Sequence, residues 1–269
     1  MVARRVSRGA GSAALAAAVL LPVSGDVLAW PFGPAPAVPV GAFATDWGYQ
    51  GETAPAHWSE LGSGYATCAE GRRQSPIDLR PTVGALAEHL SFAYRSSPLS
   101  LVNDGRLIWG DHLAGSHLIF DERRYELVRY QFHTPSEHRI DGRAADMEVQ
   151  LVHRDAVGHF LIVAVMVEAG RRSNSILRRI AEHLPDPGER FYGGQVGVNP
   201  LFLLPNDRDH LAYPGSLTVP PCTEGVDWLV LSTPLVADAA VVQRFRQAMG
   251  VNARPVQPVA GRPVVYRRR

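Results

Sequence analysis

A chain of 269 residues, of which 46% are hydrophobic and 20% charged, has the composition of an ordinary folded domain, which argues against disorder and against a fibrous repeat. Its formal net charge of +1 comes with basic residues that are scattered along the chain, so nothing predicts a nucleic-acid partner. No stretch beyond the N-terminal region approaches the roughly 20 apolar residues of a membrane-spanning helix. We therefore expect a globular mature protein without a membrane span.

The first 29 residues have the pattern of a secretory signal peptide. Arginines occur near the start, an apolar run follows from Ala13 to Val23, and Val27–Ala29 fits a cleavage site. The apolar run is too short to span a bilayer comfortably. We therefore predict a signal peptide over residues 1–29 and export to the periplasm or the medium.

Residues 30–42 are rich in proline and alanine, whereas residues 43–269 carry the apolar segments of a folded domain. Because prolines disfavour regular structure, we expect the first stretch to be a flexible spacer. No internal repeat or second linker interrupts the rest, which predicts one domain over 43–269. We expect Arg267–Arg269 at its end to be a solvated tail.

Short alternating apolar segments dominate this domain and predict β-strands. Helical patterns are few, and the clearest are Asn174–Leu184 and Ala237–Met249. The expected class is therefore mainly β (α+β), a large sheet with peripheral helices. The expected strands are Leu99–Val102, Leu118–Phe120, Tyr125–Phe132, Met147–Val152, Leu161–Val167 and Trp228–Leu231.

The two cysteines, Cys68 and Cys222, lie far apart in the sequence. In an oxidising compartment an even number of cysteines favours disulfide formation, here one bridge that closes a long loop. Two unpaired buried thiols are the alternative.

Eight segments, spread over nearly all of the predicted domain, form a specific series. They are Asp46–Tyr49, His57–Trp58, Gln74–Asp78, Asn103–Gly105, Phe132–His138, Glu148–His153, Tyr213–Cys222 and Asn252–Pro258. In order and approximate spacing the series resembles the alpha-class carbonic anhydrases. The resemblance implies a single domain around a twisted, largely antiparallel sheet, with a conical cavity whose floor holds zinc.

The same resemblance implies several local features. It places Cys68 and Cys222 where bacterial and extracellular relatives have their disulfide. It also implies that the Ser75–Pro76 and Pro220–Pro221 bonds are cis, which costs little before proline and bends the loop that carries Thr218.

Carbonic anhydrase chemistry requires zinc held by three neutral imidazoles, so that the bound water ionises near neutral pH. In the family the first two ligands lie two residues apart on one strand, where side chains share a face, and the third lies on a neighbouring strand. Here the matching positions carry Gln131, His133 and Gln150. Because an amide oxygen is a weak donor for zinc, we expect metal affinity to collapse and no cofactor to be bound.

Two arginines support the same expectation. Arg129 matches the family's glutamine that supports the first ligand, and its fixed cation offers no acceptor and repels a divalent metal. Arg106 follows Asn103–Gly105, where the fastest relatives carry a histidine that relays protons. An arginine stays protonated and cannot perform that relay.

The other pocket residues keep the family pattern. Thr218 and Glu137 match the pair that orients zinc-bound hydroxide, and we expect this pair to be vestigial. Glu148 matches the acceptor behind the third ligand. The apolar pocket residues, for which we favour a packing role over a retained CO₂ site, are Val152, Ile162, Leu217, Val219 and Trp228.

Four further histidines are candidates for metal ligands. His138 and His153 match buried histidines of the family that are held by hydrogen bonds, and we expect that role here. His112 and His117 lie on another segment. A rewired metal site would require one of them to point into the cavity of His133.

Two classes of function follow. The first is an exported binding module without ordinary zinc-dependent hydration, whose partner is a protein or a small anion such as bicarbonate. The residues expected to face the anion are Arg129, Gln131, Gln150 and Thr218, with Arg106 nearby. The second is a carbonic anhydrase of reduced activity, with zinc held by His133 and unusual ligands.

Arg129 has two interpretations within the first class. Its guanidinium either binds an anion, or pairs with Glu137 or Glu148 and fills the place of the metal. The second interpretation leaves the fold as a surface for interaction with another protein.

Overall fold

The computed structural model describes residues 47–268, with the exception of residues 88 and 173. The predicted signal peptide, the spacer and residues 43–46 of the predicted domain lie outside the described residues. Their assignments therefore stay predictions.

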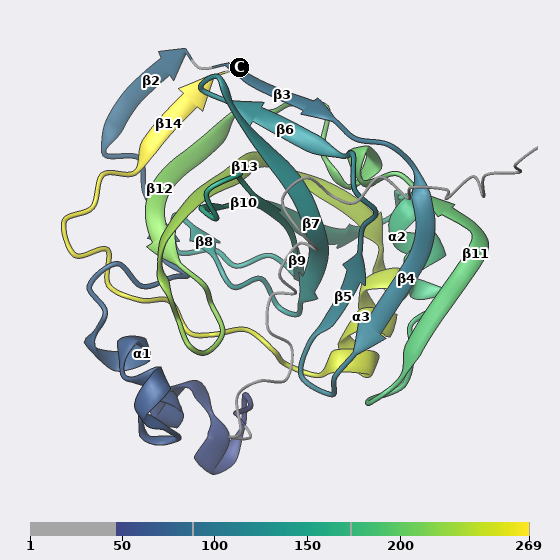
Figure 1. Ribbon diagram of the computed structural model, residues 1–269, viewed down its shortest axis with the longest axis horizontal. Helices are drawn as coiled ribbons and strands as arrows, with labels where there is room; N and C mark the ends of the chain where they lie inside the picture. The colour runs from purple at the N-terminus through teal and green to yellow at the C-terminus, as the bar shows by residue number, and fades with distance from the viewer. Residues whose placement is uncertain (1–46, 88, 173, 269) are drawn as a thin grey trace, which may run out of the picture. The chain divides into compact units, whose positions relative to one another are not determined.

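One large sheet organises the described chain (Figure 1). Its strands are β2 (Val83–Ala87), β3 (Leu90–Ala93), β4 (Ser97–Asn103), β5 (Ile108–Asp111), β6 (His117–Phe120), β7 (Arg123–His133), β9 (Met147–Arg154), β10 (Phe160–Gly170), β11 (Arg190–Val198), β12 (His210–Ser216), β13 (Glu224–Asp238) and β14 (Val265–Arg268). The strand order is β11-β4-β5-β7-β9-β10-β13-β12-β14-β2, and β3 joins β7 through β6. Neighbours are antiparallel except β10 with β13 and β14 with β2. The predicted mainly-β class is confirmed.

Short elements complete the architecture. A separate two-stranded sheet pairs β1 (Asp78–Leu79) with β8 (Arg139–Ile140) in parallel. The short helical elements are η1 (Gly51–Thr53), η2 (Pro55–Glu60), η3 (Ser63–Tyr65), α1 (Thr67–Glu70) and η4 (Pro200–Leu203). The peptide bonds Ser75–Pro76 and Pro220–Pro221 are cis as expected, and Thr134–Pro135 is cis as well.

A disulfide joins Cys68 of α1 to Cys222, with 5.0 Å between their Cα atoms. The predicted bridge is therefore confirmed. The backbone carbonyls of both cysteines are also held, since Arg254 Nη2 donates to Cys68 O at 2.8 Å and Gln74 Nε2 donates to Cys222 O at 3.1 Å. The bridge thus fastens the N-terminal helical segments to the loop that follows Thr218.

Two helices cover one face of the sheet. Because strand side chains alternate, Phe132 of β7 and Leu151 of β9 point to this face and pack in one large apolar cluster with α2 (Ser175–Ala181) and α3 (Ala239–Met249). Asn174 caps α2, because its Oδ1 accepts from the backbone nitrogens of the next turn.

Both predicted helices are present, with different ends. The helix predicted over Asn174–Leu184 stops at Ala181, and Pro185 follows the predicted end. The helix predicted from Ala237 begins two residues later, because Ala237 still pairs with Ala169 of β10.

The predicted strands all lie within observed ones, but the chain end was wrongly predicted. Arg267 and Arg268 belong to β14, and Arg267 pairs with His210 of β12. They form part of the sheet rather than a solvated tail, because β14 pairs with β12 on one side and with β2 on the other.

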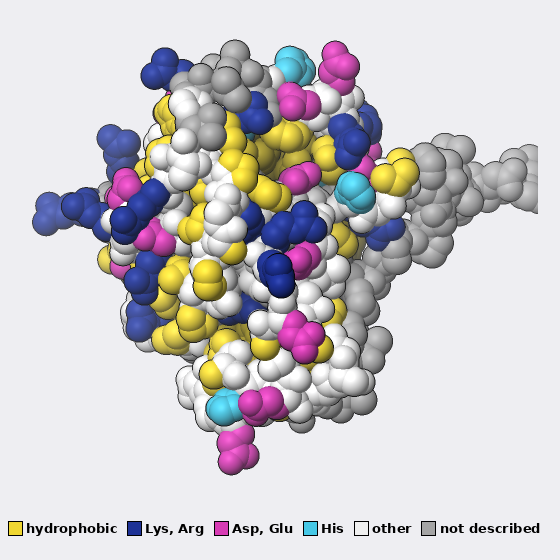
Figure 2. All heavy atoms as spheres, turned by 90° about the vertical axis from the view of Figure 1, so that its left-hand side faces the viewer, with side chains coloured by type: hydrophobic (Ala, Val, Ile, Leu, Met, Phe, Trp, Pro, Cys, Tyr) yellow, Lys and Arg dark blue, Asp and Glu magenta, His cyan; other side chains and the backbone are white. Residues whose placement is uncertain are grey.

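None of the helices described is long and apolar enough to cross a membrane. Figure 2 shows the face on the side of β2 and β14, where arginine side chains are interspersed with acidic ones and with apolar patches.

Candidate functional site

The site is built on the face of the sheet opposite α2 and α3. Arg129, Gln131 and His133 are alternate residues of β7, and the pairing with β9 runs without a break from Arg129 to His133. Their side chains therefore share one face. On β9, Gln150 lies directly opposite Gln131, and Glu148 lies opposite His133. The strand register thus gathers the three residues that the sequence aligned with zinc ligands.

The two glutamines are joined by a buried hydrogen bond. Gln131 Nε2 donates to Gln150 Oε1 at 2.7 Å, and Gln150 Nε2 donates to Glu137 Oε2 at 2.8 Å and to Glu148 Oε1 at 2.9 Å. Carboxylates only accept, so these two contacts determine which end of the Gln150 amide is nitrogen. The Gln150 oxygen must then accept, and Gln131 must present its nitrogen. Both side chains are less than 5% exposed.

His133 is fixed from its other side by the backbone of Asn252. Its Nδ1 lies 2.8 Å from Asn252 O, which can only accept, so Nδ1 carries a proton. His133 Nε2 is 3.4 Å from Gln131 Nε2 and 3.5 Å from Glu137 Oε2. The imidazole nitrogen that faces the two glutamines is therefore already in contact with an amide and a carboxylate.

Glu148 is a fully buried carboxylate with several donors. Its Oε2 accepts from the backbone nitrogens of Glu137 and His138 at 2.9 and 2.8 Å, and its Oε1 lies 2.8 Å from His138 Nδ1. Burial raises the pKa of Glu148, but the charge and hydrogen bonds of His138 outweigh it and lower the pKa to about 2. Glu148 is thus an anion that Gln150 helps to satisfy.

Glu137 and Thr218 are both buried, at 2% and 3% exposure. Glu137 Oε1 accepts from the backbone nitrogen of Arg254 at 3.0 Å, and its Oε2 accepts from Gln150. Within the described residues no hydrogen bond joins Thr218 to Glu137. Glu137 and Thr218 match the family's pair in sequence, but both oxygens of Glu137 accept hydrogen bonds from other groups.

Arg129 is 7% exposed and lies over an indole ring. Its Cζ is 5.5 Å from the ring centroid of Trp109, and its Nε is buried without a hydrogen-bond partner among the described residues. Burial lowers the pKa of Arg129 to about 10, while the charges of Asp111 and Asp104 act to raise it.

The pairing of Arg129 with a glutamate, one of the two interpretations drawn from the sequence, is not found. The part of the chain that the structure describes has no ion pair between Arg129 and Glu137 or Glu148, because both carboxylates are occupied by the contacts given above. Arg129 is therefore a nearly buried cation without an ion-pair partner there.

Arg106 belongs to a different contact group. Its Nη1 donates to Trp47 O at 3.1 Å, its Nε lies 3.6 Å from Asp104 Oδ2, and its Cζ is 4.8 Å from the Trp47 ring centroid. These contacts hold it against the N-terminal segment, and no contact to the two glutamines is present in the residues described.

The histidines divide as expected. His138 Nε2 lies 2.7 Å from Tyr213 Oη, and His153 contacts the hydroxyl of Tyr94 and the carbonyl of Leu161. Burial lowers the pKa of His153 to about 3. Both are therefore buried histidines held by hydrogen bonds.

His112 and His117 are held elsewhere. The His112 ring lies 3.0 Å from Ser97 Oγ and 2.7 Å from Ser116 Oγ, and burial lowers its pKa to about 4. His117 Nε2 lies 3.0 Å from Arg124 Nη1. The structure brings neither histidine into contact with His133, so it gives no support to a rewired metal site.

The apolar pocket residues pack in a second apolar cluster on this face of the sheet. Val152, Ile162 and Trp228 face one another across β9, β10 and β13, because they are register partners in that order. Leu217 packs against the cluster and is partly buried, as is Val219. This packing agrees with the structural role that we favoured for them.

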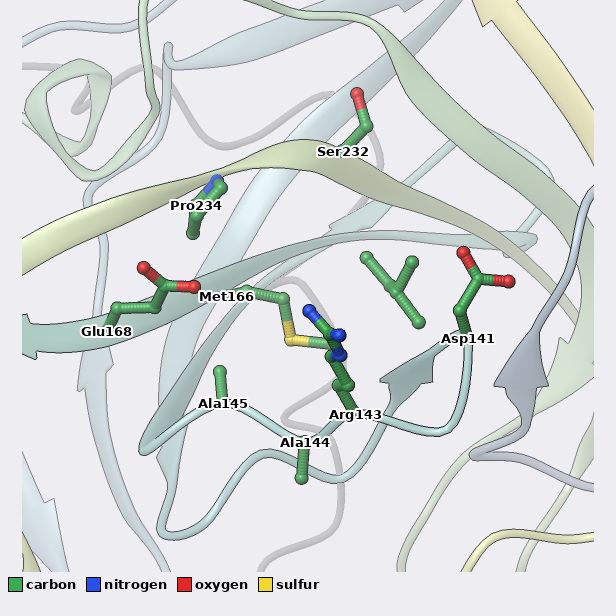
Figure 3. Close-up of a pocket in the computed structure, with 9 residues that line it drawn as sticks. Asp141, Arg143, Ala144, Ala145, Met166, Glu168, Ser232 and Pro234 are labelled. Carbon is green, nitrogen blue, oxygen red and sulfur yellow. The ribbon is translucent and has the colours of Figure 1, made fainter.

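Figure 3 shows a separate hollow, and one of its lining residues, Ile140, packs against this cluster. It has a volume of about 480 Å³ and is lined by Ile140, Asp141, Arg143, Ala144, Ala145, Met166, Glu168, Ser232 and Pro234. Figure 3 shows the Arg143 guanidinium between the carboxylates of Asp141 and Glu168. None of the residues predicted for the site lines it.

The donor set gathered on β7 and β9 does not fit zinc as the family requires it. His133 is the single imidazole, the Gln150 oxygen already accepts from Gln131, and the Gln150 nitrogen serves two carboxylates. The described residues contain no group of three or more His, Cys, Asp or Glu side chains that could hold a metal ion.

Three residues of the site were not singled out individually from the sequence. Asn252 and Arg254 hold His133 and Glu137 through their backbones, and both lie in the quoted segment Asn252–Pro258. Trp109, whose ring contacts the Arg129 guanidinium, belongs to none of the motifs found in the sequence. Its place opposite Gln131 on β5 could be found only from strand pairing.

Comparisons with known proteins were made with this geometry in hand. The profile of the eukaryotic-type carbonic anhydrases matches residues 53–268. A carbonic anhydrase of Nostoc sp. is 36% identical over 84% of this chain and 88% of that protein. The solved alpha-carbonic anhydrase of Photobacterium profundum is 37% identical, with a TM-score of 0.78 over 82% of this chain and all of that one.

A third relative has a different name. The crystal structure of dioscorin complexed with ascorbate is 29% identical, with a TM-score of 0.78 over 83% of this chain and 98% of that chain. The fold is thus shared by proteins named as carbonic anhydrases and by one with a different name.

Proposed function

Because the chain belongs to the eukaryotic-type, alpha-class carbonic anhydrase family, we propose that it is an exported binding protein that lacks ordinary zinc-dependent CO₂ hydration. Its ligand is a small anion, and the surface around the site is available to a protein partner. Gln131 and Gln150 stand at two of the three zinc-ligand positions of the family, and His133 stands at the third. No zinc is expected to be bound.

The observation that carries this proposal is the double contact of Gln150. Its amide nitrogen donates to Glu137 and to Glu148, the two carboxylates of the site. In buried surroundings an anion needs a cation or several donors, and the amide supplies donors without a metal. A hydrogen-bonded network of amides and carboxylates, without a metal, therefore supports the fold at this position.

The anionic nature of the ligand is supported by Arg129. This cation is almost fully buried and has no ion-pair partner among the described residues, and burial of an unpaired charge is costly. Binding of an anion removes part of that cost. The dioscorin whose structure contains ascorbate is a precedent in this fold for a small organic ligand.

Export is supported by the disulfide between Cys68 and Cys222, since such bridges persist in oxidising compartments. The proposed compartment is the periplasm or the medium.

The competing function is a carbonic anhydrase of reduced activity. One support is the relatives that carry that name. The other is Oε1 of Gln131, which has no hydrogen-bond partner among the described residues and could serve as a metal ligand two residues before His133. In that case zinc would be held by His133 and atypical ligands.

Stopped-flow CO₂ hydration distinguishes the two functions. The matched control is a variant that carries Arg129→Gln, Gln131→His and Gln150→His, which restores the family's pattern in the same chain. We expect the natural chain to stay at the uncatalysed rate with zinc present, and the control variant to exceed it. If the natural chain catalyses CO₂ hydration, and if a primary sulfonamide inhibits this activity and His133→Ala abolishes it, the protein is a carbonic anhydrase.

A further inference from the structure

Two buried polar atoms on the site's face of β7 lack a hydrogen-bond partner among the described residues. They are Nε of Arg129, a donor, and Oε1 of Gln131, an acceptor. The two residues are next but one on the strand and share a face, so their Cα atoms are about 7 Å apart. A buried donor and a buried acceptor left unpaired on one face of a strand are unfavourable, and they point to a ligand that satisfies both.

The Gln131 oxygen is an acceptor by necessity. The Gln150 nitrogen is committed to two carboxylates, so the Gln150 oxygen faces Gln131 and requires a donor there. Rotation of the Gln131 amide by half a turn would place two oxygens against each other. Oε1 of Gln131 therefore remains available to accept a hydrogen bond from a ligand.

A negatively charged ligand would stabilise the buried Arg129 guanidinium. The acidic groups whose charges act on Arg129 are Asp111 and Asp104. Asp111 Oδ1 accepts from the Trp109 indole at 3.1 Å, and Asp104 Oδ1 accepts from the backbone nitrogens of Arg106 and Leu107 at 2.9 and 2.7 Å. Both carboxylates are thus engaged by other donors, and Arg129 has a hydrogen bond to neither.

From these two atoms we infer that the anion bound at this site carries a hydroxyl group, with its charged oxygens on the Arg129 guanidinium and its O–H donating to Gln131 Oε1. This inference rests on the proposed anion-binding function and narrows it. The ligand class is the small hydroxylated monoanion, of which bicarbonate and the 2-hydroxycarboxylates are the simplest members. Planar anions of the same charge without a hydroxyl leave the Gln131 oxygen unpaired.

Isothermal titration calorimetry of the natural chain with matched anions tests the inference, in chloride-free buffer near neutral pH. The first pair is bicarbonate and nitrate, which have similar shape and equal charge but differ in the hydroxyl. The second pair is glycolate and acetate. Because an unpaired buried acceptor costs about 1–3 kcal/mol, the hydroxylated member of each pair is expected to bind roughly five- to a hundredfold more tightly.

Variants assign the effect to the two residues. Gln131→Met is expected to retain nitrate and acetate binding but to lose the preference for the hydroxylated anions. Arg129→Gln is expected to bind none of the four. Arg124→Gln removes an arginine of the same strand that is exposed and paired with Glu126, and it is expected to behave as the natural chain does.

The outcomes separate this inference from the proposed function. Equal affinity for bicarbonate and nitrate, and for glycolate and acetate, would overturn the hydroxyl requirement while the anion-binding function stands. No binding of any of the four at millimolar concentration would overturn both. Since these comparisons use the natural chain, they remain decisive even where a variant does not fold.

Discussion

Gln131 of β7 and Gln150 of β9 are direct register partners, and the amide nitrogen of the first donates to the amide oxygen of the second at 2.7 Å. Each amide therefore limits what the other can bind. The pair uses the side-chain oxygen of Gln150 internally and leaves that of Gln131 free. This asymmetry is the basis of both proposals, because it removes one zinc donor and leaves one acceptor for another ligand.

The first prediction concerns the stability that Gln150 provides. Gln150→Leu removes the donor from Glu137 and Glu148, two buried carboxylates. Since a hydrogen bond to a charged group contributes about 1.5–3 kcal/mol, we expect the free energy of unfolding to fall by about 3 kcal/mol or more. Urea denaturation measures it.

The control for this prediction is Gln195→Leu, which makes the same change on an exposed position of β11. We expect it to alter stability by about 0.5 kcal/mol or less. Similar midpoints for the two variants would show that the amide of Gln150 is not needed by the carboxylates.

The second prediction concerns the disulfide. Cys68 and Cys222 are separated by 154 residues in the sequence, and removal of such a bridge typically costs about 2–5 kcal/mol, a value that depends on the model of the unfolded chain. The double variant Cys68→Ser, Cys222→Ser is expected to unfold at a correspondingly lower urea concentration. The reduced natural chain is its internal control, and an unchanged midpoint on reduction would contradict the prediction.

The third prediction is a pH dependence that comes from His153. Burial lowers the pKa of His153 to about 3 in the folded chain, whereas an unfolded histidine titrates near about 6.5. Between these values the unfolded chain binds more protons, so stability rises with pH. This contribution is fully present above about pH 6.5 and is lost as pH falls toward 3.

His153→Gln is expected to flatten that part of the profile, measured as the free energy of unfolding between about pH 4 and 7. His57→Gln, at an exposed position, serves as the control and should leave the slope unchanged. A profile in which both variants keep the slope of the natural chain would show that His153 is not the group responsible.

Much of the core sheet could be predicted from the sequence because its strands are long and alternate clearly. β7, β9 and β10 were predicted from apolar periodicity. The motif at Phe132–His138 fixed the alignment with the family, which places Gln131 and His133 at two ligand positions of one strand. Local pattern was sufficient there, since most residues of each strand are buried.

The strands near the sheet edges were missed for a physical reason. β12 contains Pro214 and Gly215, β11 contains several glycines, and β14 ends in arginines, and these residues weaken the local signal of a strand. Each forms because a distant partner supplies its backbone hydrogen bonds. That information is absent from the local sequence.

The side-chain contacts of the site were beyond the sequence for a similar reason. The orientation of the Gln150 amide depends on Glu137, which reaches it from outside the paired strands, and the separation of Arg129 from Glu137 and Glu148 depends on which donors those carboxylates already have. Charge complementarity alone favoured an ion pair that the packed structure does not form.

Zinc per chain is the measurement that tests the central claim most directly. The purified protein, with its disulfide formed, is dialysed against micromolar zinc, then against metal-free buffer, and its zinc content is determined by elemental analysis. The variant that carries Arg129→Gln, Gln131→His and Gln150→His is measured alongside it. We predict near-zero zinc in the natural chain and about one zinc per chain in the variant. About one zinc per natural chain, lost on His133→Ala, would contradict the account.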